Sequence, residues 1–135
     1  RRQQCRLPRR RCLLSALAFH RLVTHIPHEV SVAIRRGAEP PRLDQPPIQV
    51  FVVSSPAFED GIVVHQLDGQ PVRIYDAEKS IADAFKFRNK IGTDVALEAL
   101  RTWASGRRRK LEKLLGHART CRIDRIIKPY LEALQ

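Results

Sequence analysis

The hydrophobic pattern of the chain changes its period at Asp76, and this change constrains the fold more than any other feature. Residues 62–75 (IVVHQLDGQPVRIY) form two apolar runs on either side of an Asp-Gly pair, which supplies the positive φ angles of a tight hairpin turn. In the segment that follows, DAEKSIADAFKFRNKIG (76–92), apolar residues recur with helical spacing instead. The chain therefore divides into a strand-forming part and a helical part.

The same signals predict the other elements before Asp76. We expect an N-terminal helix over residues 12–22 and strands over 29–34 and 48–54, the strands being separated by a Pro-rich connection. A brief turn or helical piece is expected at SPAFEDG, just ahead of the hairpin.

Three further helices are expected in the C-terminal half, over residues 94–105, 107–118 and 122–134. Thr93 or Asp94 is expected to cap the first of them, and Pro129 to kink or split the last near Ile127. This order of elements predicts an α+β fold: a mainly antiparallel sheet of about four strands, with an N-terminal helix and a C-terminal helical half.

Acidic and basic side chains crowd into the start of the helix after Asp76, and two interpretations compete. A nuclease of the PD-(D/E)xK type needs two carboxylates and a Lys to meet around Mg²⁺. Glu78 and Lys79 are adjacent and point in different directions, while Asp76 and Glu78 share a face only in a strand. We therefore expect Asp76 to be the helix N-cap, with Glu78 at the positive end of the helix dipole. The polar positions of the helix are expected to line its exposed face: Lys79, Asp83, Lys86 and Lys90.

Other catalytic and metal-binding patterns are missing from the sequence. It contains no G-x-S-x-G motif and no phosphate-cradling glycine loop, so we expect no catalytic residues, no cofactor and no enzymatic activity. Cys12 with His20, His25 and His28 invites a zinc interpretation, but the paired spacing of the usual sites is lacking, and no metal site is expected. Three cysteines, an odd and sparse number, indicate a reducing, cytoplasmic location.

The formal net charge of +11 is unevenly distributed. Residues 1–12 contain six Arg and no acid (+6), residues 13–75 five bases and six acids (−1), and residues 76–135 fourteen bases and eight acids (+6). Such a surplus favours a polyanionic partner, with nucleic acid first. No apolar run approaches the roughly 18–20 residues of a membrane span, so no membrane partner is expected.

Two segments follow from this distribution. Residues 1–11 are expected to be a basic tail, disordered or a truncated edge, ahead of one domain over 12–135. The chain contains no Met, which indicates part of a longer reading frame.

The basic clusters of the C-terminal half are the candidate nucleic-acid contacts. The run at 107–110 is expected to begin a helix, where the dipole disfavours cations, so we expect it to serve phosphate contacts rather than helix stability. The alternative is a solvated face that only keeps the domain soluble. The candidate DNA-binding residues are Arg107, Arg108, Arg109, Lys110, Lys113, Arg119, Arg122 and Arg125, and Lys128 continues their helical spacing.

The chain also resembles a known family in three strings: CLLSALAFHRLVTHIPHEVSVAI, RGAEPPRLDQPPIQV and DGQPVRIYDAEKSIADAFKFRNKIGTDVALEALR. Together they are similar to the C-terminal antitoxin region of AbiEi-type proteins, the antitoxins of type IV toxin–antitoxin systems tied to phage abortive infection. The resemblance runs from Cys12 to Leu134 and is most specific over residues 72–101.

This resemblance implies a non-enzymatic antitoxin that opposes a nucleotidyltransferase-like toxin encoded beside it. Such proteins usually also carry an N-terminal winged helix-turn-helix that binds and represses the promoter of the operon. We expect this chain to lack that domain, because nothing before Cys12 can form it. The expected partners are the toxin and, through the basic helices, DNA. The alternatives are a metal-dependent nuclease-like relic or a non-specific nucleic-acid-binding module; the family brings no catalytic residues.

Overall fold

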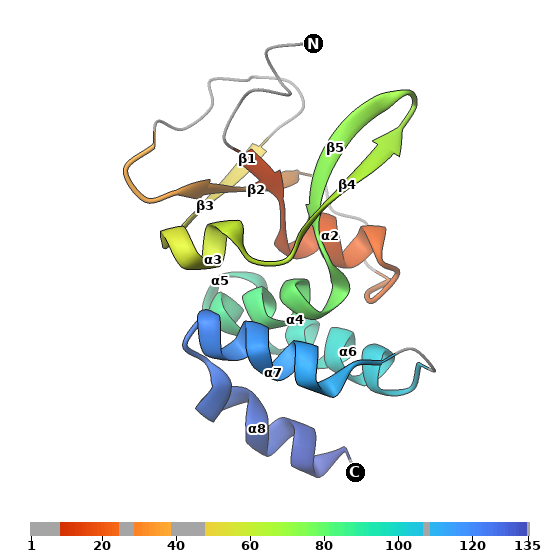
Figure 1. Cartoon of the computed structure of the whole chain (residues 1–135). Coiled ribbons are helices and arrows are strands. Elements are labelled where there is room, and N and C mark those ends of the chain that lie inside the picture. Colours follow the sequence, from red (N-terminus) through yellow and green to blue (C-terminus); the bar gives the residue numbers. More distant parts are fainter. Residues whose placement is uncertain (1–8, 25–28, 39–47, 107–108, 135) are drawn as a thin grey trace.

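A computed structural model describes residues 9–24, 29–38, 48–106 and 109–134. Figure 1 shows a sheet with two short helices at one end of the molecule and a group of helices at the other. The strands are β1 (Arg9–Arg11), β2 (Val30–Arg35), β3 (Ile48–Val53), β4 (Ile62–Leu67) and β5 (Gln70–Tyr75). The helices are α2 (Leu13–Phe19), α3 (Ser55–Glu59), α4 (Ala77–Lys86), α5 (Arg88–Ile91), α6 (Thr93–Ala104), α7 (Leu111–Thr120) and α8 (Asp124–Ala133).

The strands form one mixed sheet in the order β3-β2-β1-β5-β4. It consists of two pairs of six-residue strands, the parallel pair β2–β3 and the antiparallel hairpin β4–β5, joined through the three-residue β1. β1 runs antiparallel to β2 and meets β5 in a parallel bridge between Arg11 and Ile74. The α+β class is confirmed, but the expectation of a mainly antiparallel sheet of about four strands was wrong.

Two features explain why the sequence did not predict this topology. Parallel pairing of β2 and β3 depends on the path of the long connection between them, and strand periodicity carries no information about that path. β1 is three consecutive arginines without apolar alternation, and it falls inside the expected tail over residues 1–11. The structure therefore places Arg9–Arg11, which the sequence assigned to the tail, in the sheet, while residues 1–8 lie outside the described part of the chain.

The hairpin has the expected turn, with Asp68 at φ 53° and Gly69 at φ 78°. The short helix before it is also as expected: α3 follows Ser54, whose hydroxyl accepts a hydrogen bond from the Ala57 N–H at 3.4 Å. At the other end of the hairpin, the Tyr75 hydroxyl donates to the Phe58 carbonyl at 2.7 Å. That bond fixes α3 against the end of β5.

The C-terminal half is helical as predicted, but its boundaries differ. The helix after Asp76 ends at Lys86 and a separate α5 precedes Gly92, which itself occupies the N-cap position of α6 in place of Thr93 or Asp94. Pro129 lies within α8 and does not split it. Because Pro removes one backbone donor, a helix can continue through it when the rest of the turn is packed, and Ile127 and Leu131 on either side are buried.

Helix α4 is the centre of the molecule. It packs against α2 on the sheet side and against α6, α7 and α8 on the other side (Figure 1). Residues 78–85, eight of its ten, are buried. A helix buried on most of its circumference needs partners for whatever polar side chains it carries.

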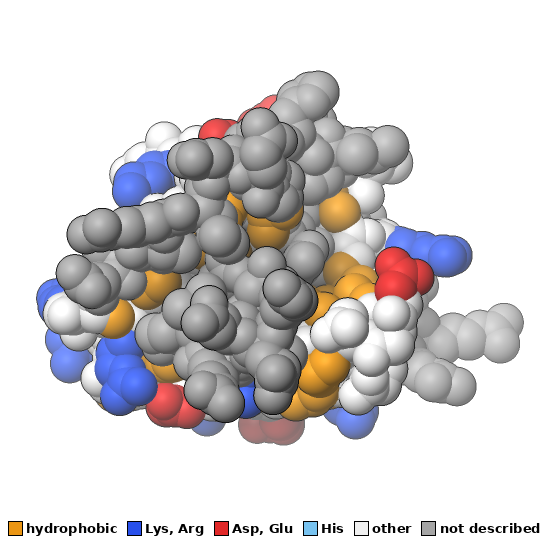
Figure 2. Space-filling view, turned by 90° about the horizontal axis from the view of Figure 1, so that it is seen from above, with side chains coloured by type: hydrophobic (Ala, Val, Ile, Leu, Met, Phe, Trp, Pro, Cys, Tyr) orange, Lys and Arg blue, Asp and Glu red, His pale blue; other side chains and the backbone are white. Residues whose placement is uncertain are grey.

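Figure 2 shows the sheet end from above, and the Lys and Arg side chains that are visible in this view lie around its periphery. Among the described residues, no helix combines the length and the apolar character needed to cross a bilayer.

Candidate functional site

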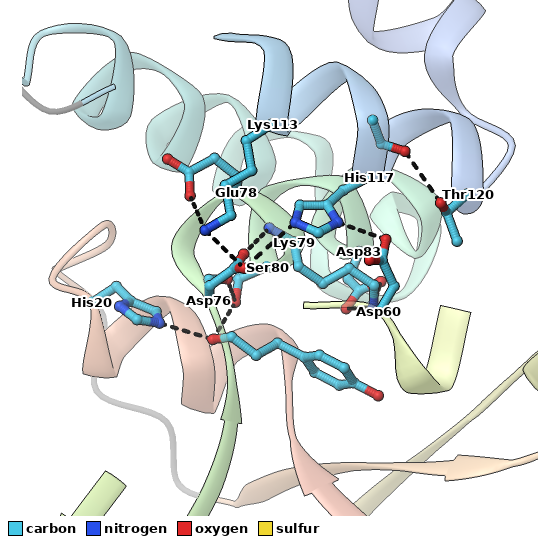
Figure 3. A network of polar contacts seen from close by, with 12 residues as sticks. His20, Asp60, Asp76, Glu78, Lys79, Ser80, Asp83, Lys113, His117 and Thr120 are labelled. Atoms are coloured by element: carbon cyan, nitrogen blue, oxygen red, sulfur yellow. Dashed lines mark hydrogen bonds and ion pairs between the residues drawn. The ribbon is translucent and has the colours of Figure 1, made fainter. Parts of the chain in front are cut away.

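A network of polar side chains surrounds the start of α4, where β5 ends (Figure 3). Asp76 is its centre and is the N-cap that the sequence predicted. Its Oδ1 accepts a hydrogen bond from the Lys79 N–H at 2.7 Å, and the Ser80 hydroxyl donates to the Asp76 carbonyl at 2.7 Å. Capping satisfies a backbone donor that the first turn of the helix leaves without a partner.

The second carboxylate oxygen of Asp76 faces helix α7. The Lys113 ammonium lies 3.2 Å from Oδ2, and the His117 Nε2 lies 3.4 Å from the same atom, without hydrogen-bond geometry. Burial raises the pKa of Asp76, but His117, the Lys79 N–H and the Lys113 charge together lower that pKa to about 2. Asp76 is therefore ionised at neutral pH.

His117 joins three elements. Its Nδ1 lies 2.6 Å from Oδ2 of Asp60, just after α3, while its Nε2 faces Asp76. Burial lowers the pKa of His117, but the two carboxylates outweigh burial and leave that pKa raised. Protonation of His117, which the raised pKa favours, places a positive charge between Asp60 at the end of α3 and Asp76 at the start of α4.

A buried ion pair lies one turn further along α4. The Lys79 ammonium donates to both oxygens of Asp83 at 2.9 Å, and the exposed fractions of the two side chains are 0% and 4%. The ammonium also lies 3.8 Å from the centre of the Tyr75 ring, and the Cys121 thiol donates to Asp83 Oδ1 at 3.4 Å. Burial lowers the pKa of Lys79, but the Asp83 carboxylate together with the nearby Cys121 and Cys12 leaves that pKa raised.

The ion pair corrects the predicted exposed face of this helix. Lys86 and Lys90 are exposed as expected, but Lys79 and Asp83 are buried. The prediction failed because a helix packed against α2, α6, α7 and α8 has no broad solvent face, so two i,i+4 partners neutralise each other inside.

Glu78 connects α4 to α6. Its Oε2 accepts a hydrogen bond from the Trp103 indole N–H at 2.9 Å, and its Oε1 lies 3.9 Å from the Lys113 ammonium. Lys113 therefore contacts both Asp76 and Glu78, two carboxylates that the sequence argument placed on different faces. A side chain from a separate helix can bridge such a pair, which sequence spacing alone does not reveal.

A glycine allows the hairpin to approach this network closely. The Gly61 carbonyl accepts a hydrogen bond from the Asp76 N–H at 2.8 Å. Gly61 has φ +79°, and a Cβ there would lie 2.6 Å from the Lys79 Cβ and 3.2 Å from the His117 Cε1. Neither the backbone angle nor the space tolerates a larger residue without rearrangement.

The predicted DNA-binding residues fall into three groups. Arg107 and Arg108 lie outside the described residues. Arg109 and Lys110 precede α7, which begins at Leu111, so the premise that this cluster forms the first turn of a helix was wrong for them. Arg109 donates to the Ala104 carbonyl at 2.6 Å, and Lys113 is paired with Asp76 and Glu78. The remaining three, Arg119, Arg122 and Arg125, are exposed around the turn between α7 and α8.

The arrangement gives no metal centre among the described residues, where no three His, Cys, Asp or Glu side chains are placed to hold an ion. Cys12 is buried, and the His20 Nε2 lies 2.8 Å from the Tyr75 carbonyl. His25 and His28 lie outside the described part of the chain. The charged side chains of the network around Asp76 are paired with one another and fix the positions of the elements that carry them. None of these paired groups is presented as a free nucleophile.

Comparison with known proteins does not assign a family. No protein-family model matches the chain, and no curated protein sequence matches it either.

Sequence reasoning found part of this network and missed the rest. It identified Asp76 and Glu78 with their structural roles. It did not single out His117 or Cys121, which contact Asp76 and Asp83 respectively, or Asp60, which joins the network through His117, 57 positions away in the chain. Polar residues with helical spacing inside an otherwise apolar stripe, such as His117 between Leu114 and Ala118, were the available signal.

Proposed function

We propose that the chain is the antitoxin and regulatory domain of a type IV toxin–antitoxin system, and that it opposes a nucleotidyltransferase-like toxin in the cytoplasm. The proposal rests on the resemblance of residues 12–134 to the C-terminal region of AbiEi-type antitoxins. Residues 72–101, the most specific part of that resemblance, contain most of β5, all of α4 and α5, and most of α6.

One observation supports a non-catalytic function for this segment. The buried polar side chains of α4 and its N-cap make structural contacts: Asp76 caps the helix, Glu78 accepts a hydrogen bond from Trp103, and Lys79 pairs with Asp83. Ser80 donates to the Asp76 carbonyl. Catalysis needs side chains that are free to react with a substrate. Side chains that are paired within the domain therefore fit a binding or regulatory function better than a catalytic one.

Growth rescue tests this proposal. The chain and the adjacent toxin would be expressed from separate inducible promoters, and colony formation would be scored with and without the chain. We expect the chain to restore growth under toxin induction, and to do so equally well with Lys86→Ala, which changes an exposed residue of α4. Growth arrest that persists while folded chain accumulates would count against antitoxin activity.

A nuclease-like relic is the second candidate, because Lys113 brings the carboxylates of Asp76 and Glu78 to within 3.2 and 3.9 Å of one ammonium. Two carboxylates with a Lys are the side chains that such a centre uses. Incubation with supercoiled plasmid and Mg²⁺ or Mn²⁺, beside an Asp76→Ala control, tests it. We expect no nicking by either protein; nicking that depends on Asp76 would favour the nuclease.

A further inference from the structure

The turn between α7 and α8 concentrates positive charge that nothing in the described structure neutralises. Residues 119–128 (RTCRIDRIIK) contain four cations and one acid. All four cations are exposed, and no described acidic side chain pairs with any of them: Arg119, Arg122, Arg125 and Lys128. Lys113 on the same helix α7 is instead engaged by two carboxylates. The turn therefore presents a cluster of exposed cations without a described acidic partner, the kind of surface that favours a polyanionic ligand.

Arg122 occupies a backbone position that favours glycine. It has φ +63°, directly after the C-cap residue Cys121 of α7. The Ile123 N–H donates to the Ala118 carbonyl at 2.9 Å, and the Arg122 N–H to the Arg119 carbonyl at 3.1 Å. These two bonds define a Schellman motif, in which the left-handed residue is usually Gly because a Cβ is disfavoured there.

Helix α2 ends with the same motif and provides an internal comparison. Arg21 has φ +58°, the Leu22 N–H donates to the Leu17 carbonyl at 2.9 Å, and the Arg21 N–H to the Ala18 carbonyl at 3.1 Å. A cation near a helix C-terminus is favoured by the dipole, which by itself accounts for an Arg at both positions. The surroundings differ, however, since Arg21 is the one Lys or Arg between positions 13 and 24.

We infer that the α7–α8 turn binds the phosphate backbone of duplex DNA, with Arg122 at the apex of the turn and Arg119, Arg125 and Lys128 flanking it. The inference deepens the proposed regulatory function and rests on it. Guanidinium groups suit phosphate oxygens because their paired donors match the phosphate geometry. A base-stacking site for single strands fits less well, since Tyr130, the aromatic residue of α8, packs at 5.3 Å on the Phe85 ring.

Comparing Arg122→Gly with Arg21→Gly distinguishes the loss of a phosphate contact from the loss of net charge and from the relief of backbone strain. Both variants lose one positive charge and relieve a left-handed Arg in the same motif. We expect each to raise the melting temperature by about 4 °C. Only Arg122→Gly should weaken binding to a fluorescein-labelled duplex of arbitrary sequence, by about fivefold at low salt, and lower the slope of log K against log salt by about 0.9.

The outcomes are distinct. If Arg21→Gly weakens binding as much as Arg122→Gly, only net charge matters and the assigned turn is wrong. If Arg122→Gly leaves both affinity and salt slope unchanged, the turn does not contact phosphate. Arg122→Lys, which keeps the charge and the left-handed conformation, should keep the salt slope of the parent chain but bind more weakly than it, because an ammonium lacks the paired donors of a guanidinium. Growth rescue by the parent chain reports on the proposed function separately, so a failed duplex assay with intact rescue overturns this inference alone.

Discussion

The ion pair of Lys79 and Asp83 gives the sharpest prediction about what holds this fold together. Both side chains are essentially buried, at 0% and 4% exposed, and two 2.9 Å contacts join them. Replacing Lys79 by Met keeps the side-chain volume but leaves the Asp83 carboxylate buried without its counter-ion. Removing one partner of such a pair typically destabilises by about 3–5 kcal/mol. A domain of this size unfolds with roughly 5–15 kcal/mol, so the loss is a large share of the total.

The double variant Lys79→Met with Asp83→Leu distinguishes a buried ion pair from simple packing. Substituting both charges by apolar side chains of similar volume is often neutral or stabilising, so we expect it to recover stability to within about 1 kcal/mol of the parent. Urea unfolding at pH 7, followed by circular dichroism and by the fluorescence of Trp103 beside α4, measures each variant. Lys86→Met on the same helix is the exposed control, with an expected change within about 0.5 kcal/mol. The buried ion pair would be refuted if the single variants Lys79→Met and Asp83→Leu each lost less than about 1 kcal/mol of unfolding free energy. It would also be refuted if the double variant lost as much as the two single variants together.

Three further predictions concern the same network. The pKa of Asp76 is lowered from 3.8 to about 2, so its contribution to the unfolding free energy, about 2 kcal/mol, is complete above pH 3.8 and is lost as pH falls toward 2. The variant Asp76→Asn should remove this dependence of the unfolding free energy on pH in the acid range. The raised pKa of His117 gives the opposite pH dependence. Its contribution to stability is present below about pH 6.5 and is lost as pH rises through the pKa of His117 in the folded state. Melting curves of the parent chain against His117→Gln from pH 6 to 9 check this, and equal pH dependence in both contradicts it. Gly61→Ala should destabilise by about 3 kcal/mol because its Cβ meets Lys79, whereas Gly69→Ala, at nearly the same φ of +78° but with open space, should lose only about 1 kcal/mol. Equal losses in urea unfolding would show that backbone angle alone governs both glycines.

The sequence predicted those parts of the fold that depend on local chemistry. The Asp-Gly hairpin, the strands flanking Pro-rich segments and the Asp76 cap follow from turn and capping preferences that act within a few residues. The parallel pairing of β2 with β3 and the insertion of β1 between β2 and β5 depend on contacts far apart in the chain. No periodicity encodes such contacts.

The candidate site likewise contains residues whose positions the sequence predicted and residues whose positions it did not. Asp76 and Glu78 were placed correctly because a cap and a first-turn acid are local features. Lys79 and Asp83 were placed on the surface because charged residues at helical spacing usually are, and only the packing of four helices around α4 puts them inside. Lys113 was taken for a DNA contact from its charge, whereas it pairs with Asp76, the N-cap of α4, and with Glu78 in the first turn of that helix.

Under the proposed antitoxin function, the buried charges of Lys79 and Asp83 serve only to stabilise the domain, so antitoxin activity should require the fold and not these charges. Growth rescue by the double variant Lys79→Met with Asp83→Leu, under induction of the adjacent nucleotidyltransferase-like toxin, tests this most directly. The account predicts that the double variant restores colony formation as well as the parent chain, while the unstable single variant Lys79→Met does not. Rescue by the parent chain together with failure of a fully folded double variant would contradict it, since the charges themselves would then be needed.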